Sequence, residues 1–279
     1  MYLIILHFCI IINAKKDKKG RIMDNIFINL LFICPLLFIA GIIDAISGGG
    51  GIIALPAYIM TGMPLSYAYG CNKLQSAVGT STALYRYARS GYVDFKAALI
   101  ASIPAVAGAF ISTRIMLLLD ESVKSAIIIV AMIFVITLTI ITNKVSVGDG
   151  GELTHVPLTL KNALLCLAVG FFLGLYDGFF GPGGGTIALM LFSIIFRYDF
   201  RTAVGNGKVI IVVSNLIALV NYIVEGTIFY EIAIPATIAN IAGSYIGASL
   251  AVKNGKKLVK KFLLAVVAIL IVQAILKLI

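Results

Sequence analysis

Two lysines and two aspartates are the residues whose types and spacing point most directly to chemistry. Lys73 and Lys208 each interrupt an apolar stretch, and Asp44 and Asp177 each stand just before a run of glycines. A charge inside a membrane helix costs about 2.5 to 3.5 kcal/mol on insertion scales, so such a charge is usually functional. The lysines are therefore candidate ligands for an anion. The aspartates are candidates for carrying a coupling proton or for structural pairing.

Each of these assignments has a structural alternative that the sequence leaves open. Both lysines lie less than three turns from the end of an expected helix, so their side chains alternatively extend to a surface. The aspartates alternatively cap neighbouring backbone amides or pair with the lysines. The sequence alone does not choose between these roles.

The glycine runs "DAISGGGGIIAL", which starts at Asp44, and "DGFFGPGGGTIAL", which starts at Asp177, interrupt stretches that are otherwise apolar. A break inside a bilayer frees backbone N–H and C=O groups, which is tolerated only where protein or a water-filled cavity satisfies them. The N-terminus of a helix that starts at such a break favours an anion. Alternatively, the glycines only permit close helix packing. The predicted substrate-binding residues are Gly49, Gly50, Gly51, Asn72, Lys73, Gly183, Gly184, Gly185, Asn206 and Lys208.

Further polar residues in the same apolar stretches rank lower, because serine and threonine are common where membrane helices pack. They are Ser47, Thr80, Ser81, Thr82, Thr186, Ser214 and Asn215.

The composition places these residues in a multi-pass membrane protein. Of 279 residues, 61% are hydrophobic and only 12% are charged, which is too little polar surface for a soluble globule of this size. Several uncharged runs are long enough to span a hydrocarbon core of roughly 30 Å as helices, and strand alternation is absent. The formal net charge of +10 resides mainly in short loops, so it indicates membrane orientation and not nucleic-acid binding.

Neither a metal site nor a catalytic constellation is visible. The four cysteines have no metal-ligand or disulfide-framework spacing, and the two histidines belong to no metal-binding pattern. There is also no P-loop of the form GxxxxGK[ST], so no nucleotide cofactor is expected. We predict a non-enzyme without cofactors.

An internal repeat organises the chain. Displacing the sequence by 135 positions places "YAYGCNK" (67–73) on "TAVGNGK" (202–208), and "AGAFI" (107–111) on "AGSYI" (242–246). The polar, glycine-rich stretch 144–157 separates the copies, so we expect a first transmembrane repeat over 23–143 and a second over 158–279. Residues 1–22 are expected to be an N-terminal extension, either a mispredicted start or an interfacial segment.

Each repeat is expected to contain five membrane-embedded helices, one of them short and preceded by the glycine-rich break. The predicted helices are 25–47, 52–63, 65–88, 93–118 and 122–143 in the first half and 158–180, 185–196, 201–224, 228–252 and 257–278 in the second. If the short helices cross the membrane, the second half is inverted relative to the first; if they are re-entrant, the halves are parallel. The loop near Gly91 is basic and the equivalent loop near Gly226 is acidic, which favours inversion.

The two glycine-rich signatures, each followed about 20 residues later by "YAYGCNK" or "TAVGNGK", resemble the two halves of the TauE/SafE family of sulfite exporters and related anion permeases. The resemblance covers nearly everything after about residue 26. It implies transport of sulfite, sulfonates or other small sulfur-containing anions across the cytoplasmic membrane. Cys71 stands where the commoner family pattern has threonine before the Asn-Lys pair.

We therefore predict an all-α, inverted-repeat secondary transporter whose partners are a small anion, the lipid bilayer and, for coupling, protons. An anion channel and a non-transporting membrane partner protein remain the alternatives.

Overall fold

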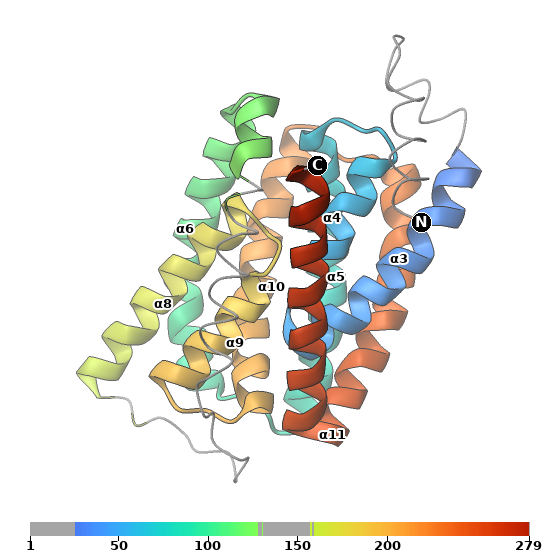
Figure 1. Ribbon diagram of the computed structural model, residues 1–279. Coiled ribbons are helices and arrows are strands. Elements are labelled where there is room, and N and C mark those ends of the chain that lie inside the picture. The colour runs from blue at the N-terminus through green and yellow to red at the C-terminus, as the bar shows by residue number, and fades with distance from the viewer. Residues whose placement is uncertain (1–25, 128–129, 131–156, 158, 279) are drawn as a thin grey trace.

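The computed structural model describes residues 26–127, 130, 157 and 159–278, with side-chain surroundings up to Asn254. The described part contains helices and no strand (Figure 1). The helices are α3 (Ile26–Ser47), α4 (Gly51–Met60), α5 (Leu65–Arg89), α6 (Phe95–Leu118), α8 (Leu160–Phe179), α9 (Gly184–Ile195), α10 (Phe200–Val224) and α11 (Tyr230–Leu278).

Five of the described helices are long and apolar enough to cross a membrane: α3, α6, α8, α10 and the part of α11 from Tyr230 to Asn254. The short helices α4 and α9 have 10 and 12 residues, too few to span a bilayer alone. α5 is long enough, with 25 residues, but it is the most polar of the helices because it carries Lys73, Asn72 and Gln75. These polar side chains are buried inside the bundle.

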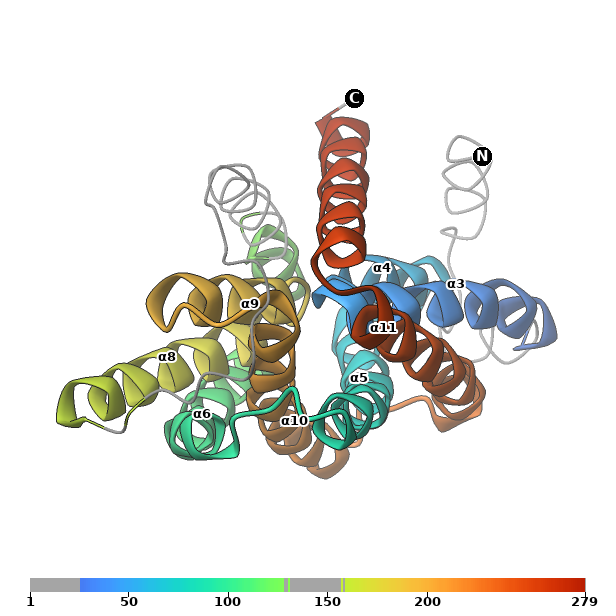
Figure 2. The same cartoon turned by 90° about the horizontal axis from the view of Figure 1, so that it is seen from below.

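Two helix pairs pack closely through glycines. α3 lies along α11, where a β carbon on Gly243 would overlap the carbonyl oxygen of Phe38, and α6 lies along α8, where one on Gly170 would overlap the carbonyl oxygen of Ala101 (Figures 1 and 2). Small residues let membrane helices approach until their backbones touch. In each pair, one helix belongs to each sequence repeat.

Replacing Gly170 with leucine is expected to destabilise the protein by about 1 to 3 kcal/mol, since the side chain can only fit if α6 and α8 separate. Size-exclusion chromatography of heated, detergent-purified protein measures the loss. The control is Gly91→Asn, because Gly91 has a φ of +77° with open space around it, and asparagine tolerates that conformation. Equal heat resistance of the Gly170 variant and the parent would contradict the close packing.

α5 and α10 pack against each other in antiparallel orientation between these pairs. Gly70, near the start of α5, lies against the carbonyl oxygen of Thr227 in the turn after α10. Gly205, near the start of α10, lies against the carbonyl oxygen of Tyr92 in the turn after α5. Each helix therefore begins beside the end of the other.

Three of the expected helices either differ from the structure or lie largely outside the described residues. The expected helices 228–252 and 257–278 are wrong as separate elements: α11 runs from Tyr230 to Leu278, although its ribbon bends sharply (Figure 2). The sequence after Pro235 contains no further proline, and the single glycine at position 255 is not enough to end a helix. The expected helix 122–143 lies largely outside the described residues, as do the N-terminal extension and nearly all of the linker.

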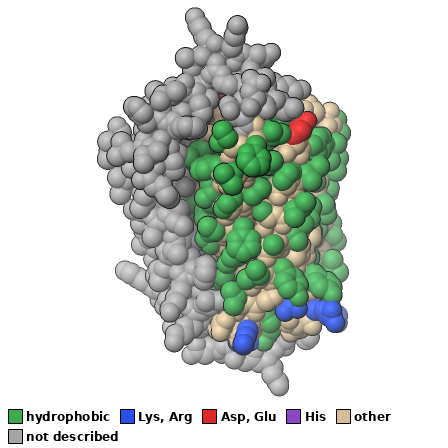
Figure 3. All heavy atoms as spheres, turned by 90° about the vertical axis from the view of Figure 1, so that its right-hand side faces the viewer, with side chains coloured by type: hydrophobic (Ala, Val, Ile, Leu, Met, Phe, Trp, Pro, Cys, Tyr) green, Lys and Arg blue, Asp and Glu red, His purple; other side chains and the backbone are tan. Residues whose placement is uncertain are grey.

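The outer surface of α3 and α11 is apolar over a broad band (Figure 3). Basic side chains lie along one rim of this band and an acidic side chain at the opposite rim. The exposed large hydrophobic residues of these helices, up to Asn254, are Phe27, Ile28, Leu31, Ile39, Tyr230, Ile234, Ile238, Tyr245, Ile246 and Leu250. Such a surface fits a hydrocarbon environment, and the protein is a multi-pass membrane protein.

Candidate functional site

The two glycine-rich stretches meet inside the protein. We call Gly48–Gly51, between α3 and α4, the first glycine segment, and Gly181–Gly185, between α8 and α9, the second glycine segment. A β carbon on Gly185 would come within 2.6 Å of the Cα of Gly48, and one on Gly51 within 2.9 Å of the Cα of Pro182. The Thr186 hydroxyl donates to the carbonyl oxygen of Ser47 at 3.0 Å. The segments thus touch directly, although they lie far apart in sequence.

Left-handed backbone explains why glycine occupies particular positions in both segments. Gly48, Gly181 and Gly183 have φ values of +80°, +74° and +83°. Residues with a β carbon rarely adopt this conformation, whereas glycine adopts it at little cost.

The first glycine segment leaves backbone donors free. Gly48 N–H donates to the carbonyl oxygen of Asp44, and Ile52 N–H to that of Gly49. Within the described structure, the N–H groups of Gly49, Gly50 and Gly51 have no acceptor.

The second glycine segment also leaves backbone N–H donors without an acceptor. Gly184 N–H donates to the carbonyl oxygen of Gly181, and Ile187 N–H to that of Gly183. No acceptor among the described residues receives a hydrogen bond from the N–H groups of Gly183 and Gly185. Free N–H groups at two adjoining helix starts make a positive surface suited to an anion.

Lys73 on α5 pairs with Asp177 on α8, across the two sequence repeats. Its Nζ lies 2.9 Å from Asp177 Oδ2, 2.6 Å from the Asp177 carbonyl oxygen and 2.9 Å from Asn215 Oδ1. Ser214 Oγ donates to the same Asp177 Oδ2 at 2.7 Å. The side chains of Lys73 and Asp177 are 1% and 3% exposed. All three ammonium protons of Lys73 therefore have an acceptor in a buried site.

Lys208 on α10 forms the reciprocal pair with Asp44 on α3. Its Nζ lies 2.6 Å from both Asp44 Oδ2 and the Asp44 carbonyl oxygen. Thr80 Oγ1 donates to Asp44 Oδ2 at 3.4 Å. The Lys208 side chain is 2% exposed and that of Asp44 is 23% exposed. Neither lysine extends to the surface, so each helps to hold the other repeat's aspartate and helix end.

Asn72 places another donor beside the second glycine segment. Gln75 Nε2 donates to Asn72 Oδ1 at 3.0 Å, which directs Asn72 Nδ2 away from Gln75. A β carbon on Gly181 would lie 3.6 Å from both Asn72 Nδ2 and Lys73 Nζ. Asn72 is 2% exposed, and its Nδ2 has no acceptor among the residues that the structure describes.

Asn206 lies apart from this cluster. Its Oδ1 accepts a hydrogen bond from Asp94 N–H at 2.7 Å, in the turn before α6. At the equivalent position of the first repeat, Cys71 Sγ accepts from Phe229 N–H at 3.3 Å. Both side chains thus hold the turn that follows the partner helix, and substrate binding by Asn206 stays a prediction.

The structure brings most of the predicted site residues together: Asp44, Gly49, Gly50, Gly51, Asn72, Lys73, Asp177, Gly183, Gly184, Gly185 and Lys208. It adds Ser214, Asn215 and Thr80, which the sequence analysis ranked lower. Their spacing carried a signal, because Thr80 and Asn215 are each seven residues after a lysine and so lie on the same helix face.

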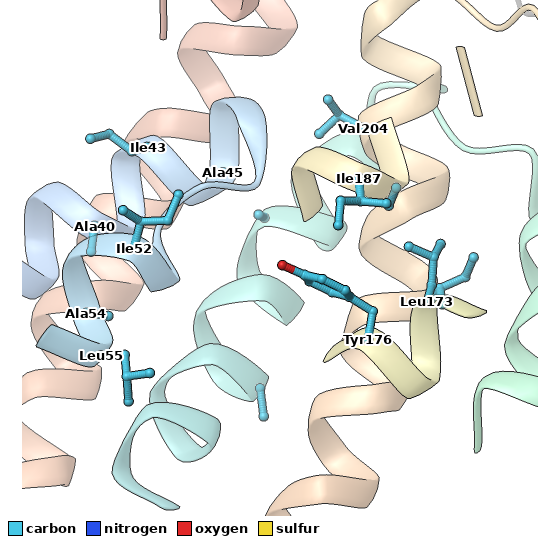
Figure 4. Close-up of a cluster of buried hydrophobic side chains, with 14 of the residues drawn as sticks. Ala40, Ile43, Ala45, Ile52, Ala54, Leu55, Leu173, Tyr176, Ile187 and Val204 are labelled. Atoms are coloured by element: carbon cyan, nitrogen blue, oxygen red, sulfur yellow. The ribbon is translucent and has the colours of Figure 1, made fainter. Parts of the chain in front are cut away.

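Buried apolar side chains from both repeats form the core of the protein. Figure 4 shows Ala40, Ile43 and Ile52 on one side and Leu173, Tyr176 and Ile187 on the other. The Tyr176 hydroxyl donates to the carbonyl oxygen of Pro182 at 2.9 Å, which fastens the second glycine segment. Charges and dipoles act strongly in such surroundings because little water screens them.

No group of three or more histidine, cysteine, aspartate or glutamate residues that could hold a metal ion occurs in the described part of the chain. The polar groups at the site are lysine, carboxylate, amide, hydroxyl and backbone N–H. Their donors favour an oxyanion over a cation.

Comparison with known proteins places the chain among membrane transporters. A probable membrane transporter protein, ORF9, of Sinorhizobium sp is 29% identical over 248 residues, which covers 87% of this chain and 91% of the relative. A probable membrane transporter protein of Haemophilus influenzae is 30% identical over 223 residues, covering 80% and 85%. The probable membrane transporter protein YfcA of Escherichia coli K12 is 24% identical over 252 residues, covering 88% and 91%. No solved structure matches the chain significantly.

The family model described as "Sulfite exporter TauE/SafE" matches residues 33–274. This range includes both glycine segments and both lysine–aspartate pairs. The chain belongs to the TauE/SafE family of membrane transporters.

Proposed function

We propose that the protein is a secondary transporter that moves a small sulfur-containing oxyanion, such as sulfite or an organosulfonate, across the cytoplasmic membrane. The anion is held between the two glycine segments and reaches each side of the membrane in turn. Protons are the coupling ion, and no cofactor takes part. The sulfur specificity rests on the family description, while the preference for an oxyanion rests on the donors of the site.

One observation carries this proposal: each lysine is paired with the aspartate of the other repeat, directly beside two glycine segments that touch. Lys73 Nζ lies 2.9 Å from Asp177 Oδ2, and Lys208 Nζ lies 2.6 Å from Asp44 Oδ2. An oxyanion has the charge and acceptor oxygens to replace a carboxylate beside a lysine, and the free N–H groups of the segments supply further donors. The pairs cross the contact between repeats, so movement of one repeat against the other alters both of them.

Several features favour an inverted arrangement of the repeats, over residues 23–143 and 158–279 with 144–157 as linker. The antiparallel packing of α5 and α10 is what inverted copies of one helix produce. The turn after α5 has Arg89 and Lys96 nearby, whereas the turn after α10 has Glu225 and Glu231. Opposite charge on equivalent turns fits opposite faces of the membrane. In this arrangement α3 with α4, and α8 with α9, are the broken helices.

Flux into proteoliposomes tests the proposal. We expect saturable uptake of radiolabelled sulfite or methanesulfonate by the purified protein, stimulated by a pH gradient and by an unlabelled anion on the opposite side. Replacing Lys208 with glutamine is expected to lower uptake at least about tenfold, as the site loses its charge-assisted donor.

The matched control is Lys161→Gln, which removes an exposed lysine at the start of α8 and is expected to leave uptake unchanged. Flux that neither saturates nor shows counterflow would mark an anion channel instead. Absence of flux for sulfite, sulfate and methanesulfonate would contradict transport of sulfur oxyanions.

A further inference from the structure

The two lysine–aspartate pairs occupy equivalent positions but are not equally satisfied. Lys73 Nζ has three acceptors, one of them Asn215 Oδ1 at 2.9 Å. Lys208 Nζ has two, both on Asp44. Thr80 stands where the second repeat has Asn215, and it donates to Asp44 in place of accepting from Lys208. One proton of Lys208 is therefore free to meet a new acceptor.

The carboxylate of Asp44 likewise has weaker hydrogen bonding and greater exposure than the carboxylate of Asp177. Asp177 Oδ2 accepts from Lys73 and, at 2.7 Å, from Ser214, and its side chain is 3% exposed. Asp44 Oδ2 accepts from Lys208 and only at 3.4 Å from Thr80, and its side chain is 23% exposed. An ionised carboxylate facing lipid is costly, so this opening suits a water-filled space. The Lys208–Asp44 contact is the shorter one, at 2.6 Å against 2.9 Å, so what sets this pair apart is its greater exposure and its fewer partners, and not a longer contact.

Among the residues whose side chains the structure describes, few charged or titratable groups surround Asp44. Lys208 of α10 is the cation that faces it, and Tyr87 of α5 is a titratable neighbour whose hydroxyl donates to the Ala45 carbonyl oxygen at 3.0 Å. On the side of α4, Gly50 lies against Asp44, and α11 presents Asn240 and Ser244 to α3 near Gly41. α9 contacts the end of α3 through Thr186. Among the described residues, Lys208 is thus the cation in direct contact with Asp44.

We infer that Lys208 and Asp44 form the exchange pair of the transporter: the anion takes the place of Asp44 on Lys208, and Asp44 then takes up a proton. The Lys73–Asp177 pair, with Asn215 and Ser214, is a brace that keeps the repeats in contact. This assignment rests on the proposed function. It adds that the two pairs, which are equivalent in the sequence repeat, have different roles: one exchanges with the anion and the other is structural.

Electrostatics couples the two steps. While Lys208 faces Asp44, the ammonium stabilises the carboxylate. When an anion occupies Lys208, the carboxylate loses its counter-cation and gains a negative neighbour, and both changes make a carboxylate bind a proton more readily. By linkage, protonation of Asp44 equally favours anion binding. One proton from solution is added to Asp44 for each anion bound, and it leaves when the anion leaves.

The brace resists the same exchange. An anion approaching Lys73 must displace a carboxylate, a carbonyl and an amide oxygen together, and Ser214 would lose its acceptor. Leaving several buried polar groups unpaired is far more costly than opening the Lys208–Asp44 contact, which has fewer partners and a more exposed carboxylate.

Infrared difference spectra of purified protein test the inference without requiring transport. Addition of methanesulfonate at constant pH is expected to produce a protonated-carboxyl band in the difference spectrum of the parent protein. Methanesulfonate stays ionised at this pH, so any proton taken up belongs to the protein. The band is expected to vanish in Asp44→Asn and to remain in Asp177→Asn. The reverse pattern, or a band that survives in Asp44→Asn, would overturn the assignment.

A second test leaves all four charged residues in place and exchanges Thr80 and Asn215, the residues at equivalent repeat positions beside the two pairs. Thr80→Asn supplies Lys208 with the third acceptor that Lys73 already has, and we expect the KM for the anion to rise at least about tenfold. The matched variant Asn215→Thr frees a proton of Lys73 and is expected to leave the pH dependence of uptake in place. Equal effects of the two exchanges would show that the pairs share one role.

These readouts separate the two claims. Absence of flux with a normal Asp44 band contradicts the proposed function and retains the protonation site. Normal, saturable flux whose pH dependence survives in Asp44→Asn contradicts the exchange pair alone.

Discussion

Replacing Lys73 with methionine is expected to destabilise the protein by about 3 to 5 kcal/mol and to abolish uptake. Methionine has a similar length and fills similar space, so the loss comes from the charge. Asp177 would keep Ser214 as a donor but would lose its cation in a site where its side chain is 3% exposed. Removing one partner of a buried ion pair is costly because the other charge stays buried without compensation.

The control for this prediction removes both charges. Lys73→Met combined with Asp177→Leu is expected to recover most of the lost heat resistance, measured by size-exclusion chromatography after heating, because no buried charge remains. Uptake should stay absent, since the brace and its hydrogen bonds are missing. If Lys73→Met alone matched the parent in heat resistance, the buried pair would carry little of the stability.

Replacing Gly185 with valine is expected to abolish uptake while the protein still inserts into the membrane. A β carbon at Gly185 would lie 2.6 Å from the Cα of Gly48 and 3.1 Å from its carbonyl oxygen, so the two glycine segments must separate. Their free N–H groups would then no longer converge on one anion. The long helices α3, α8 and α10 do not depend on this contact for their own hydrogen bonds, so insertion should continue.

The neighbouring glycine provides the matched control. The nearest atoms to a β carbon at Gly184 would be Asp177 Oδ1 at 3.1 Å, Ile211 Cδ1 at 3.3 Å and Asp177 Cβ at 3.6 Å, all of them side-chain atoms. Gly184→Ala is therefore expected to keep at least about half of the uptake, whereas Gly185→Val keeps almost none. Uptake is measured in proteoliposomes and normalised to inserted protein. Similar losses in both variants would indicate that bulk anywhere in the segment is harmful.

Much of the helix arrangement could be predicted because hydrophobic runs and breaks are local signals. The predicted helices 65–88 and 201–224 agree closely with α5 (Leu65–Arg89) and α10 (Phe200–Val224). Asp94 and Asp199 cap the N-termini of α6 and α10 with side-chain hydrogen bonds, which is a strong local start signal. The continuity of α11 past Asn254 was missed, because a polar, glycine-containing stretch weakens a helix without ending it.

The partners of the charged residues could not be predicted, because they depend on contacts between distant helices. The sequence offered Asp44 and Asp177 as possible partners for the lysines, but it gave no reason to pair Lys73 with the aspartate of the other repeat. The repeat alignment also treats the pairs as equals. Their difference arises from neighbours such as Asn215 and Thr80, whose effect depends on side-chain geometry.

The crossed pairing has a consequence for how the protein is made. During synthesis the first repeat enters the membrane before the second, so Lys73 and Asp44 must wait for partners that the ribosome has not yet produced. A first half made alone would retain a buried cation and a carboxylate without counter-charges, and a second half made alone would carry the complementary defect. Neither half is thus a complete unit for membrane quality control, and separately produced halves are expected to persist only when they are expressed together.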